Sequence, residues 1–459
     1  MNERSLLNAA QRGFLLLACA TALVASGCGS SSKTAAQNAG NFSTTVFIGD
    51  SLTAGYQNGS LLDTQQPNGY ANLIAQQAKF TLTLPLIAPP GAPNVMKLVS
   101  LGPPPVTTTV PGNTIGRDDY MVQATDLGVP GAFVNDVLNT VPVDVPTTPE
   151  QQITQLVIGF PGLSNNIART QLGWAEALKP TTIFVWIGNN DALVADITGM
   201  PASMTPLSNF TTQFTQLMTD LSKQTHANLV VANIPDVTTV PYLTPALEVL
   251  EEACMEATGS VTPACIAGMS QTLGIQPASS TYAGDLVNPT GLAEVPLILT
   301  GKQAPPITDS GFLSAAEVVQ VQQMVLSYNQ VIQQQASAVG ATLVDIHSVF
   351  VQAAAGLPIN GYTGTFAYLG GLFSLDGIHP TNTGYAVLAN AFIDTMNANL
   401  KTTIPDVDLA AIAAKDPLWT PNLLAAFGAQ PSSKQHISVA AGQSVAWMWP
   451  KYGGKIAVQ

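Results

Sequence analysis

A serine at the end of an apolar run is the first residue whose type and position could do chemistry. In residues 44–56, TTVFIGDSLTAGY, the run 45–48 predicts a buried strand that Gly49 and Asp50 bring to an end. Ser51 would then lie at the carboxyl edge of a sheet, where α/β proteins bind their ligands. Its hydroxyl could attack a substrate, or it could only cap a helix or close a turn.

A nucleophilic serine needs a general base and an acid that orients the base. Residues 374–385, SLDGIHPTNTGY, supply both, because Asp376 and His379 are three residues apart in a turn closed by Pro380. This spacing lets the carboxylate reach one imidazole nitrogen while the other faces outward. We therefore predict that Ser51, His379 and Asp376 form a catalytic triad.

The sequence contains four histidines, and the other three fit the role of base less well. His226 falls between a predicted helix and a predicted strand, and His436 lies in the C-terminal region. His347 follows the end of a predicted strand, with Asp345 two residues before it. His347 is thus the main alternative to His379.

The elements that must position these residues alternate between strands and helices. Runs typical of buried parallel strands occur at 44–49, 120–128, 181–188, 227–234 and 341–346. Helices with one apolar face lie between or after them, and these faces consist of Phe210, Phe214, Leu217 and Leu221; Val318, Val321, Val325, Tyr328 and Ile332; and Tyr385, Leu388, Phe392 and Met396. The alternation predicts an α/β fold in which helices cover both faces of a parallel sheet.

Taken together, FIGDSLTAGY and DGIHPTNTGY resemble the motifs of the GDSL, or SGNH, hydrolase family. The resemblance implies a Ser-His-Asp esterase or lipase that needs no metal and no cofactor. It also implies a flavodoxin-like three-layer α/β/α sandwich with a mostly parallel five-stranded sheet and loop insertions. In this family the oxyanion hole takes two donors from the middle of the chain. The block DLGVPGA places one on Gly131 and WIGNNDAL places the other on Asn190, beside the N–H of Ser51.

Other residues near these motifs are given different roles. Asp50 and Asp191 are interpreted as structural, because neighbours on a strand end point in different directions. Trp186 is predicted to lie in the core. Tyr56 and Phe133, which follow the serine and the donor glycine, are predicted to line the substrate pocket.

Composition limits the possible partners. The formal net charge is −13, and no cluster of Lys or Arg occurs, so nucleic-acid binding is excluded. We expect a small-molecule or lipid ester as the substrate.

The N-terminal region predicts export and a lipid anchor. Arg4 and Arg12 precede an apolar run, 14–24, that is too short to span a bilayer, which is typical of a signal peptide. Its end, LVASGCGSSS, resembles a bacterial lipoprotein lipobox with Cys28 as the lipidated residue, although Ala25 departs from the usual leucine. Ordinary cleavage with Cys28 incidental remains the alternative. The expected location is the cell envelope, with membrane contact through the lipid and an outer-membrane preference.

Two further cysteines, Cys254 and Cys265, are separated by ten residues. An oxidising compartment favours a disulfide between them. A metal site there is disfavoured because no histidine or further cysteine lies nearby.

The predicted organisation is a signal peptide at 1–28, a flexible tether at 29–43, a hydrolase domain at 44–399 and a C-terminal extension at 400–459. Two segments, 81–118 and 240–312, break the strand–helix rhythm and are interpreted as insertions that build or cover the site.

The predicted function is cleavage of carboxylic esters through an acyl-enzyme. Apolar stretches in the second insertion favour lipid or long-chain esters. One alternative is a carbohydrate O-deacetylase or acyltransferase, because the same residues support that chemistry. Another is a non-catalytic surface lipoprotein that binds a glycan or a protein.

Overall fold

The computed structural model describes residues 40–102, 105–112, 116–428 and 435–449. The predicted signal peptide, Cys28 and most of the predicted tether lie outside the described residues. At the end of that tether, the Asn41 carbonyl accepts hydrogen bonds from the Thr181 hydroxyl at 2.8 Å and the Thr182 hydroxyl at 2.7 Å. Contacts to the hydrolase domain therefore begin a few residues before the predicted boundary at 44.

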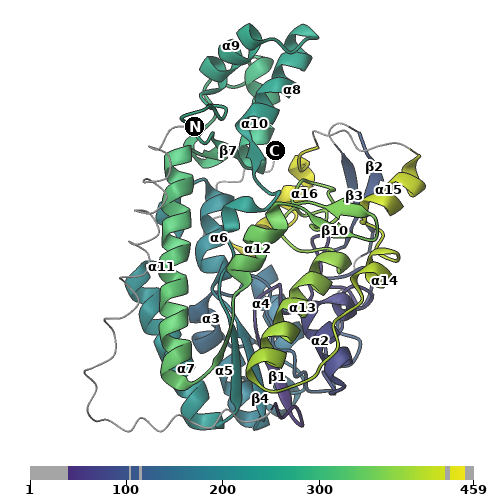
Figure 1. The fold of residues 1–459 in the computed structure, drawn as a ribbon, viewed down its shortest axis with the longest axis vertical. Helices are drawn as coiled ribbons and strands as arrows, with labels where there is room; N and C mark the ends of the chain where they lie inside the picture. Colours follow the sequence, from purple (N-terminus) through teal and green to yellow (C-terminus); the bar gives the residue numbers. More distant parts are fainter. Residues whose placement is uncertain (1–39, 103–104, 113–115, 429–434, 450–459) are drawn as a thin grey trace, which may run out of the picture. The chain divides into compact units, whose positions relative to one another are not determined.

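A parallel sheet forms the centre of the fold (Figure 1). Within the described residues it has four strands in the order β1 (Thr45–Gly49), β4 (Thr182–Trp186), β5 (Asn228–Ala232) and β9 (Thr342–Val344). Every residue of β1 and β4 is buried, as expected for strands covered on both faces. Because the strands are parallel, Ser51 after β1 and Asn190 after β4 come to the same edge.

The fifth predicted strand, 120–128, is not a strand, and this corrects the expected five-stranded sheet. The segment does lie beside β1, where the Phe47 N–H donates to the Thr125 carbonyl at 2.9 Å. The strand pairing, however, is limited to one isolated parallel bridge, between Phe47 and Asp126. The physical reason is local: the Gly49 N–H, which would pair next along this bridge, donates instead to the Gln171 side-chain oxygen at 3.0 Å, and such a side-chain bond competes with strand pairing.

Helices cover both faces of the sheet (Figure 1). On one side α7 packs against α3, α5 and α11, and on the other α13 packs against α2 and α12. The predicted apolar faces of α7, α11 and α13 are buried, and Ser314 and Glu317 form a capping box at the start of α11. The bounds of the helices named so far and of two others are α2 (Tyr70–Ala78), α3 (Val134–Asn139), α4 (Pro149–Ile158), α5 (Gln171–Leu178), α6 (Asn189–Thr198), α7 (Leu207–Thr225), α11 (Ala315–Val339), α12 (Ile346–Ala354) and α13 (Asn382–Asn399).

Both predicted insertions are folded. The first contains an antiparallel hairpin of β2 (Met96–Ser100) and β3 (Val106–Thr109). The second contains three helices and a small antiparallel sheet, and a disulfide joins Cys254 to Cys265. Its elements are β6 (Thr244–Pro245), α8 (Ala246–Thr258), α9 (Pro263–Leu273), β7 (Leu286–Val287), α10 (Pro289–Leu299) and β8 (Phe312–Leu313).

The described part of the C-terminal extension packs on the hydrolase domain. The Asp416 carboxylate accepts the Thr383 N–H at 2.8 Å and the Thr383 hydroxyl at 2.7 Å, which ties the extension to the start of α13. Trp419 and Trp449 are both buried. The helices of the extension are α14 (Leu409–Ala413), α15 (Thr420–Phe427) and α16 (Val439–Gln443), and a 3₁₀ turn follows at Ala446–Met448. Before the extension, β10 (Leu357–Ile359) and β11 (Tyr362–Gly364) form a hairpin.

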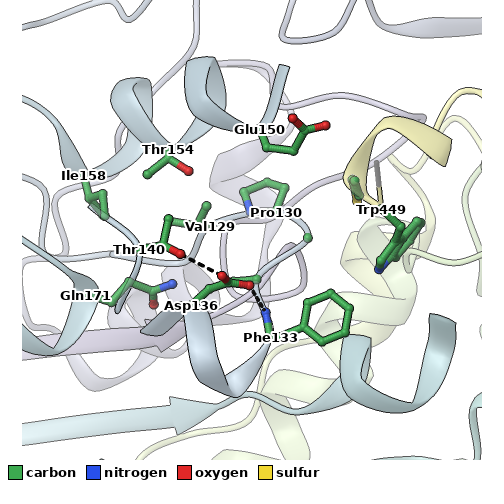
Figure 2. Close-up of a pocket in the computed structure, with 13 residues that line it drawn as sticks. Val129, Pro130, Phe133, Asp136, Thr140, Glu150, Thr154, Ile158, Gln171 and Trp449 are labelled. Atoms are coloured by element: carbon green, nitrogen blue, oxygen red, sulfur yellow. Dashed lines mark hydrogen bonds between the residues drawn. The ribbon is translucent and has the colours of Figure 1, made fainter. Parts of the chain in front are cut away.

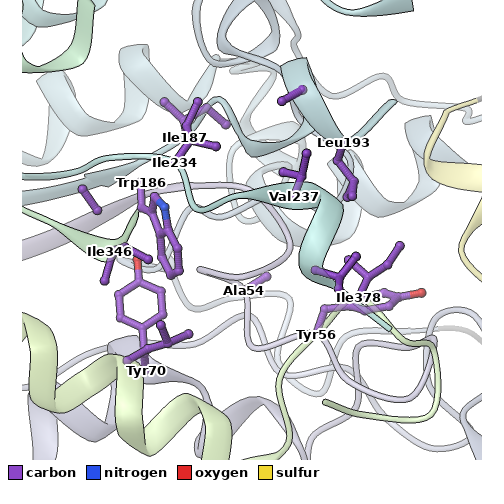
Figure 3. Packing of buried hydrophobic residues seen from close by; sticks show 14 of the residues in the cluster. Ala54, Tyr56, Tyr70, Trp186, Ile187, Leu193, Ile234, Val237, Ile346 and Ile378 are labelled. Atoms are coloured by element: carbon purple, nitrogen blue, oxygen red, sulfur yellow. The ribbon is translucent and has the colours of Figure 1, made fainter. Parts of the chain in front are cut away.

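Large aromatic side chains fill the core between the sheet and its helices (Figure 3). Trp186, predicted as a core residue, is fully buried against Tyr70, with ring centroids 5.3 Å apart. Its indole N–H donates to the Asn233 carbonyl at 3.1 Å, so its one polar atom is satisfied. Over the described ranges, no helix combines the length and the apolar character needed to cross a bilayer.

Candidate active site

The structure brings the three predicted catalytic residues into one hydrogen-bonded chain. The Ser51 Oγ lies 2.8 Å from the His379 Nε2, and the His379 Nδ1 lies 3.1 Å from the Asp376 Oδ2. These distances are within hydrogen-bond reach for a nucleophile, its base and the group that orients the base. The three side chains come from two places, the turn after β1 and the loop before α13.

The loop that carries Asp376 and His379 is held by its own carboxylate. The Asp376 Oδ1 accepts the backbone N–H groups of Ile378 at 3.0 Å and His379 at 2.8 Å. Its Oδ2 also accepts the N–H of Gly59 at 2.9 Å. Between the acid and the base, Gly377 has a φ of +72°, a conformation that L side chains rarely adopt. The backbone of residues 376–379 thus folds around the Asp376 carboxylate. This is why a spacing of three residues fixes the position of the His379 imidazole.

Asp376 is kept as a carboxylate by its partners. Complete burial acts to raise its pKa, but the charge of His379 and the hydrogen bonds from His379 and Gly59 outweigh it. The pKa of Asp376 is therefore held below its ordinary value. An ionised acid at this position favours the His379 tautomer whose Nε2 accepts the serine proton.

The predicted oxyanion donors surround the serine edge of the sheet. Neither the Ser51 N–H nor the Gly131 N–H has a hydrogen-bond partner within the described residues. The Asn190 side-chain amide donates one hydrogen to the Ala132 carbonyl at 2.9 Å, which fixes its orientation and leaves its second hydrogen for another acceptor. Gly131 has a φ of +80°, a backbone conformation that L side chains rarely adopt, so this position favours glycine. The N–H groups of Ser51 and Gly131 and one amide hydrogen of Asn190 thus have no acceptor among the described residues and remain available to an oxyanion.

Asp50 and Asp191 have structural partners, as predicted from the sequence. The Asp50 carboxylate accepts the Leu52 N–H at 3.0 Å and the Asn189 side-chain amide at 2.9 Å, and it has no hydrogen bond to His379. Asp191 accepts the backbone N–H of Val134 at 3.1 Å. Burial raises the pKa of Asp50 to about 6 and that of Asp191 to about 7, against the hydrogen bonds that favour the ionised forms.

The other histidines lie elsewhere. His226 ends α7 in a left-handed conformation. His347 lies in the first turn of α12, where its Nδ1 contacts the Ile234 carbonyl at 3.3 Å. His436 contacts the carboxylate of Glu252 in α8. Geometry therefore favours His379 over His347 as the base.

A cavity of about 290 Å³ adjoins the oxyanion donor Gly131 (Figure 2). Phe133, predicted to line the substrate pocket, lies on its wall, and Met448 and Trp449 of the C-terminal extension also line it. Tyr56, the other predicted lining residue, is fully buried, with its ring centroid 4.6 Å from that of His379. It is not among the residues that line this cavity.

Sequence reasoning did not find three residues of the site. Gly59 was visible only as part of an Asn-Gly turn, and nothing local indicates that its N–H reaches Asp376. Gln171, whose side-chain oxygen accepts the Gly49 N–H at 3.0 Å, carries no motif at all. Trp449 stood out as an aromatic residue, but its position against the oxyanion loop is set by tertiary packing.

A family model matches this chain over the same region. The model of the GDSL-like Lipase/Acylhydrolase family aligns with residues 45–392, a span that includes the triad and both donors. The chain belongs to this family. This confirms the resemblance seen in the motifs, and it makes the GDSL protein described here an ester hydrolase of the serine type that acts on small-molecule esters.

Solved structures give more distant likenesses to this GDSL chain. An α/β hydrolase enzyme from the metagenome of Lake Arreo, Spain, is 14% identical, with a TM-score of 0.33 and coverage of 77% of this chain and 94% of its own. An acetylxylan esterase from Geobacillus stearothermophilus is 13% identical, with a TM-score of 0.33 and coverage of 77% and 93%. No curated protein matched the chain.

The role of Asp376 predicts a large loss of turnover on substitution. In Asp376→Asn the amide can present N–H to His379 and favour the wrong tautomer, so we expect kcat for p-nitrophenyl acetate to fall by about 10³–10⁴-fold. The matched control is His347→Ala, which should keep kcat within about threefold of wild type. Equal losses in the two variants would contradict the assignment of His379 as the base.

The raised pKa of Asp50 predicts that the stability of the fold depends on pH. Its folded-state pKa of about 6 lies above the ordinary value of 3.8, so the folded protein binds its proton more tightly than the unfolded chain does. This contribution is complete below about pH 4 and is lost as the pH rises to about 6. A pKa difference of about two corresponds to about 3 kcal/mol of unfolding free energy.

The measurement is urea unfolding of wild type and Asp50→Asn between about pH 4 and pH 7. The Asn189 side-chain oxygen has no partner within the described residues, so its amide can turn to accept from the new residue. We expect the stability of the variant relative to wild type to rise across this range and then level off. Parallel curves would show that burial does not raise the pKa of Asp50.

Proposed function

We propose that this protein is a carboxylic ester hydrolase of the esterase or lipase type that acts through an acyl-enzyme on Ser51. The observation that carries the proposal is the 2.8 Å contact between the Ser51 Oγ and the His379 Nε2, together with the backbone N–H groups of Ser51 and Gly131, which have no partner in the part of the chain that the structure describes. A serine that only capped a helix would have no use for this arrangement. The geometry is that of a nucleophile next to its base and its oxyanion donors.

In the proposed reaction, the Ser51 Oγ attacks the ester carbonyl carbon while its proton passes to the His379 Nε2. The negative charge on the carbonyl oxygen is met by the N–H groups of Ser51 and Gly131 and by the Asn190 amide. When the tetrahedral intermediate collapses, His379 gives the proton to the leaving alcohol and the acyl group stays on Ser51. Water then attacks the acyl-enzyme with His379 as base, which releases the acid and restores the serine.

The cavity beside Gly131 is the proposed place for the acyl group. Its walls include apolar side chains from α4 and from the loop before α3, namely Ile158 and Phe133, and in this structure Met448 and Trp449 of the C-terminal extension line it as well. Glu150 and Asp136 add acidic groups to the same wall. This lining favours an uncharged acyl chain over a charged one.

Ester hydrolysis by wild type beside Ser51→Ala tests the proposal. Protein beginning at residue 29 would be assayed with p-nitrophenyl esters from acetyl to palmitoyl, because the chain-length profile reports how much apolar surface the acyl site offers. We expect turnover by wild type and a loss of about 10⁴-fold or more in the variant, since removing the nucleophile leaves only the oxyanion hole and binding.

Silence of both proteins on every ester would contradict the proposed function. Turnover that survives in Ser51→Ala would show that another residue is the nucleophile. Circular dichroism of the variant serves as the control, because a change of one hydroxyl should leave the secondary structure as it is in wild type.

We also propose that the protein is exported and lipid-anchored through Cys28. The support is the apolar run and lipobox-like end of residues 14–28, together with the disulfide between Cys254 and Cys265, a bond that persists in oxidising compartments. A single diacylated cysteine followed by Gly29 and serines would leave the hydrolase domain on a tether at the membrane surface.

Metabolic labelling with alkyne palmitate in a bacterial host tests this anchor. The full chain should be labelled and should sediment with membranes, whereas Cys28→Ser should be unlabelled. Cys19→Ser is the matched control, since Cys19 lies inside the predicted leader, and it should behave as wild type does. Full labelling of Cys28→Ser would rule the anchor out.

A further inference from the structure

The C-terminal segment 435–449 lies across both insertions. At its start, the Gln435 side-chain amide donates to the Leu101 carbonyl at 2.7 Å, next to the β2–β3 hairpin. On the other side, His436 contacts the carboxylate of Glu252 in α8. The beginning of the segment is therefore anchored to both predicted insertions, through Leu101 in the first and Glu252 in the second.

The same segment reaches the two halves of the catalytic site. The Trp447 indole N–H lies 3.4 Å from the Tyr56 hydroxyl, and the Tyr56 ring packs on His379. At the oxyanion donor, the Met448 carbonyl lies 2.9 Å from the point where a Cβ on Gly131 would be. Residues 447–448 thus contact Tyr56, which packs on His379, and lie beside Gly131.

This packing leaves little of the catalytic site open. Ser51 is 5% exposed and His379 is 1% exposed. An ester must bring its carbonyl carbon to within about 3–3.5 Å of the serine oxygen, with its oxygen at the N–H of Gly131. The Met448 backbone lies beside that glycine, and Met448 and Trp449 line the cavity next to it, so an ester that approaches the glycine from this cavity meets the segment.

The underside of the segment explains why it stays closed in water. Ile437, Val445, Met448 and Trp449 are all nearly or fully buried, so lifting the segment exposes four apolar side chains. One feature opposes closure: the buried Trp449 indole N–H finds no hydrogen-bond partner among the described residues. Apolar burial therefore stabilises the closed segment, and one unsatisfied donor destabilises it. A few contacts can then change which state is favoured.

We propose that residues 435–449 are a cover that closes the active site in this structure and must be displaced before an ester can reach Ser51. The inference rests on the proposed function, because it concerns access to the same serine. Its consequence is that turnover is limited by the fraction of molecules whose cover is open. Contacts far from the chemistry, at residues 435–438, then control the rate.

A reversible cross-link can hold the cover shut. The hydroxyl oxygens of Thr107 in β3 and Ser438 lie 3.4 Å apart, and β2 of the same hairpin is fixed to the turn after β1 because the Met96 N–H donates to the Asn58 carbonyl at 3.0 Å. The double variant Thr107→Cys/Ser438→Cys would join the cover to this hairpin when oxidised. Each single variant and wild type, treated with the same oxidant and reductant, are the controls.

A loosened cover is the opposite test. Gln435→Ala/His436→Ala removes the two anchoring contacts without changing a residue at the serine edge. Ala440→Ser, on an exposed position of the same segment, is the matched control. The probe is a fluorophosphonate, whose rate of labelling at Ser51 reports access, and p-nitrophenyl acetate turnover is measured beside it.

We expect the loosened variant to be labelled about tenfold faster than wild type, and the oxidised double-cysteine variant about tenfold slower until it is reduced. A segment with a merely structural role would give slower labelling when loosened. Equal labelling rates in the wild-type, loosened and cross-linked proteins would overturn the proposal that residues 435–449 cover the active site. Labelling that follows the expected order without any ester turnover would count against the proposed function alone, and no labelling even of the loosened variant would overturn both.

Discussion

The buried carboxylate of Asp376 is the interaction on which the site depends. It accepts three backbone N–H groups, those of Gly59, Ile378 and His379, and it holds the His379 ring as well. A buried charge is costly unless it is paired and hydrogen-bonded, so these donors must all be present for the fold to close. Two of them come from the loop itself and one from the turn after β1. The carboxylate thus sets the distance between the serine and its base.

The sheet supplies the rest of the site through its common edge. Ser51 follows β1 and Asn190 follows β4, while the segment with Gly131 runs beside β1 without completing a strand. Two buried acids brace this last segment. Asp126 binds the Gly128 N–H and Asp191 binds the Val134 N–H. Burial raises the pKa of Asp126 to about 8, so this acid is mostly protonated at neutral pH and adds little charge near the oxyanion donors.

Sequence patterns predicted the parts of the site that depend on local spacing. Ser51 could be placed because it follows a strong apolar strand, and Asp376 and His379 because three residues in a turn bring them together, while the position of Asn190 followed from the resemblance of WIGNNDAL to the family's motif. The fifth strand failed because the side chain of Gln171 takes the Gly49 N–H that the ladder would need. Gly59 could not be foreseen as a partner of Asp376, because it contributes a backbone N–H, which every residue except proline has.

The C-terminal extension shows where such reasoning stops. Tryptophans favour burial, yet burial alone does not choose between the outer surface of the domain and the mouth of the site. The choice depends on the shape of the surface that the rest of the chain builds, which no local pattern records. The structure places Trp449 against the oxyanion loop and Trp419 next to Tyr362, on separate parts of the domain.

The separation of the site's parts along the chain has a consequence for folding. Ser51 and His379 are 328 residues apart, and Tyr56 and Trp447 are 391 apart. Contacts at such separations close very large loops, and proteins dominated by non-local contacts fold slowly. A molecule that has collapsed and formed its helices would therefore still have no catalytic centre. In refolding experiments, hydrolytic activity would appear as one of the last events and would report the joining of distant segments rather than the formation of secondary structure.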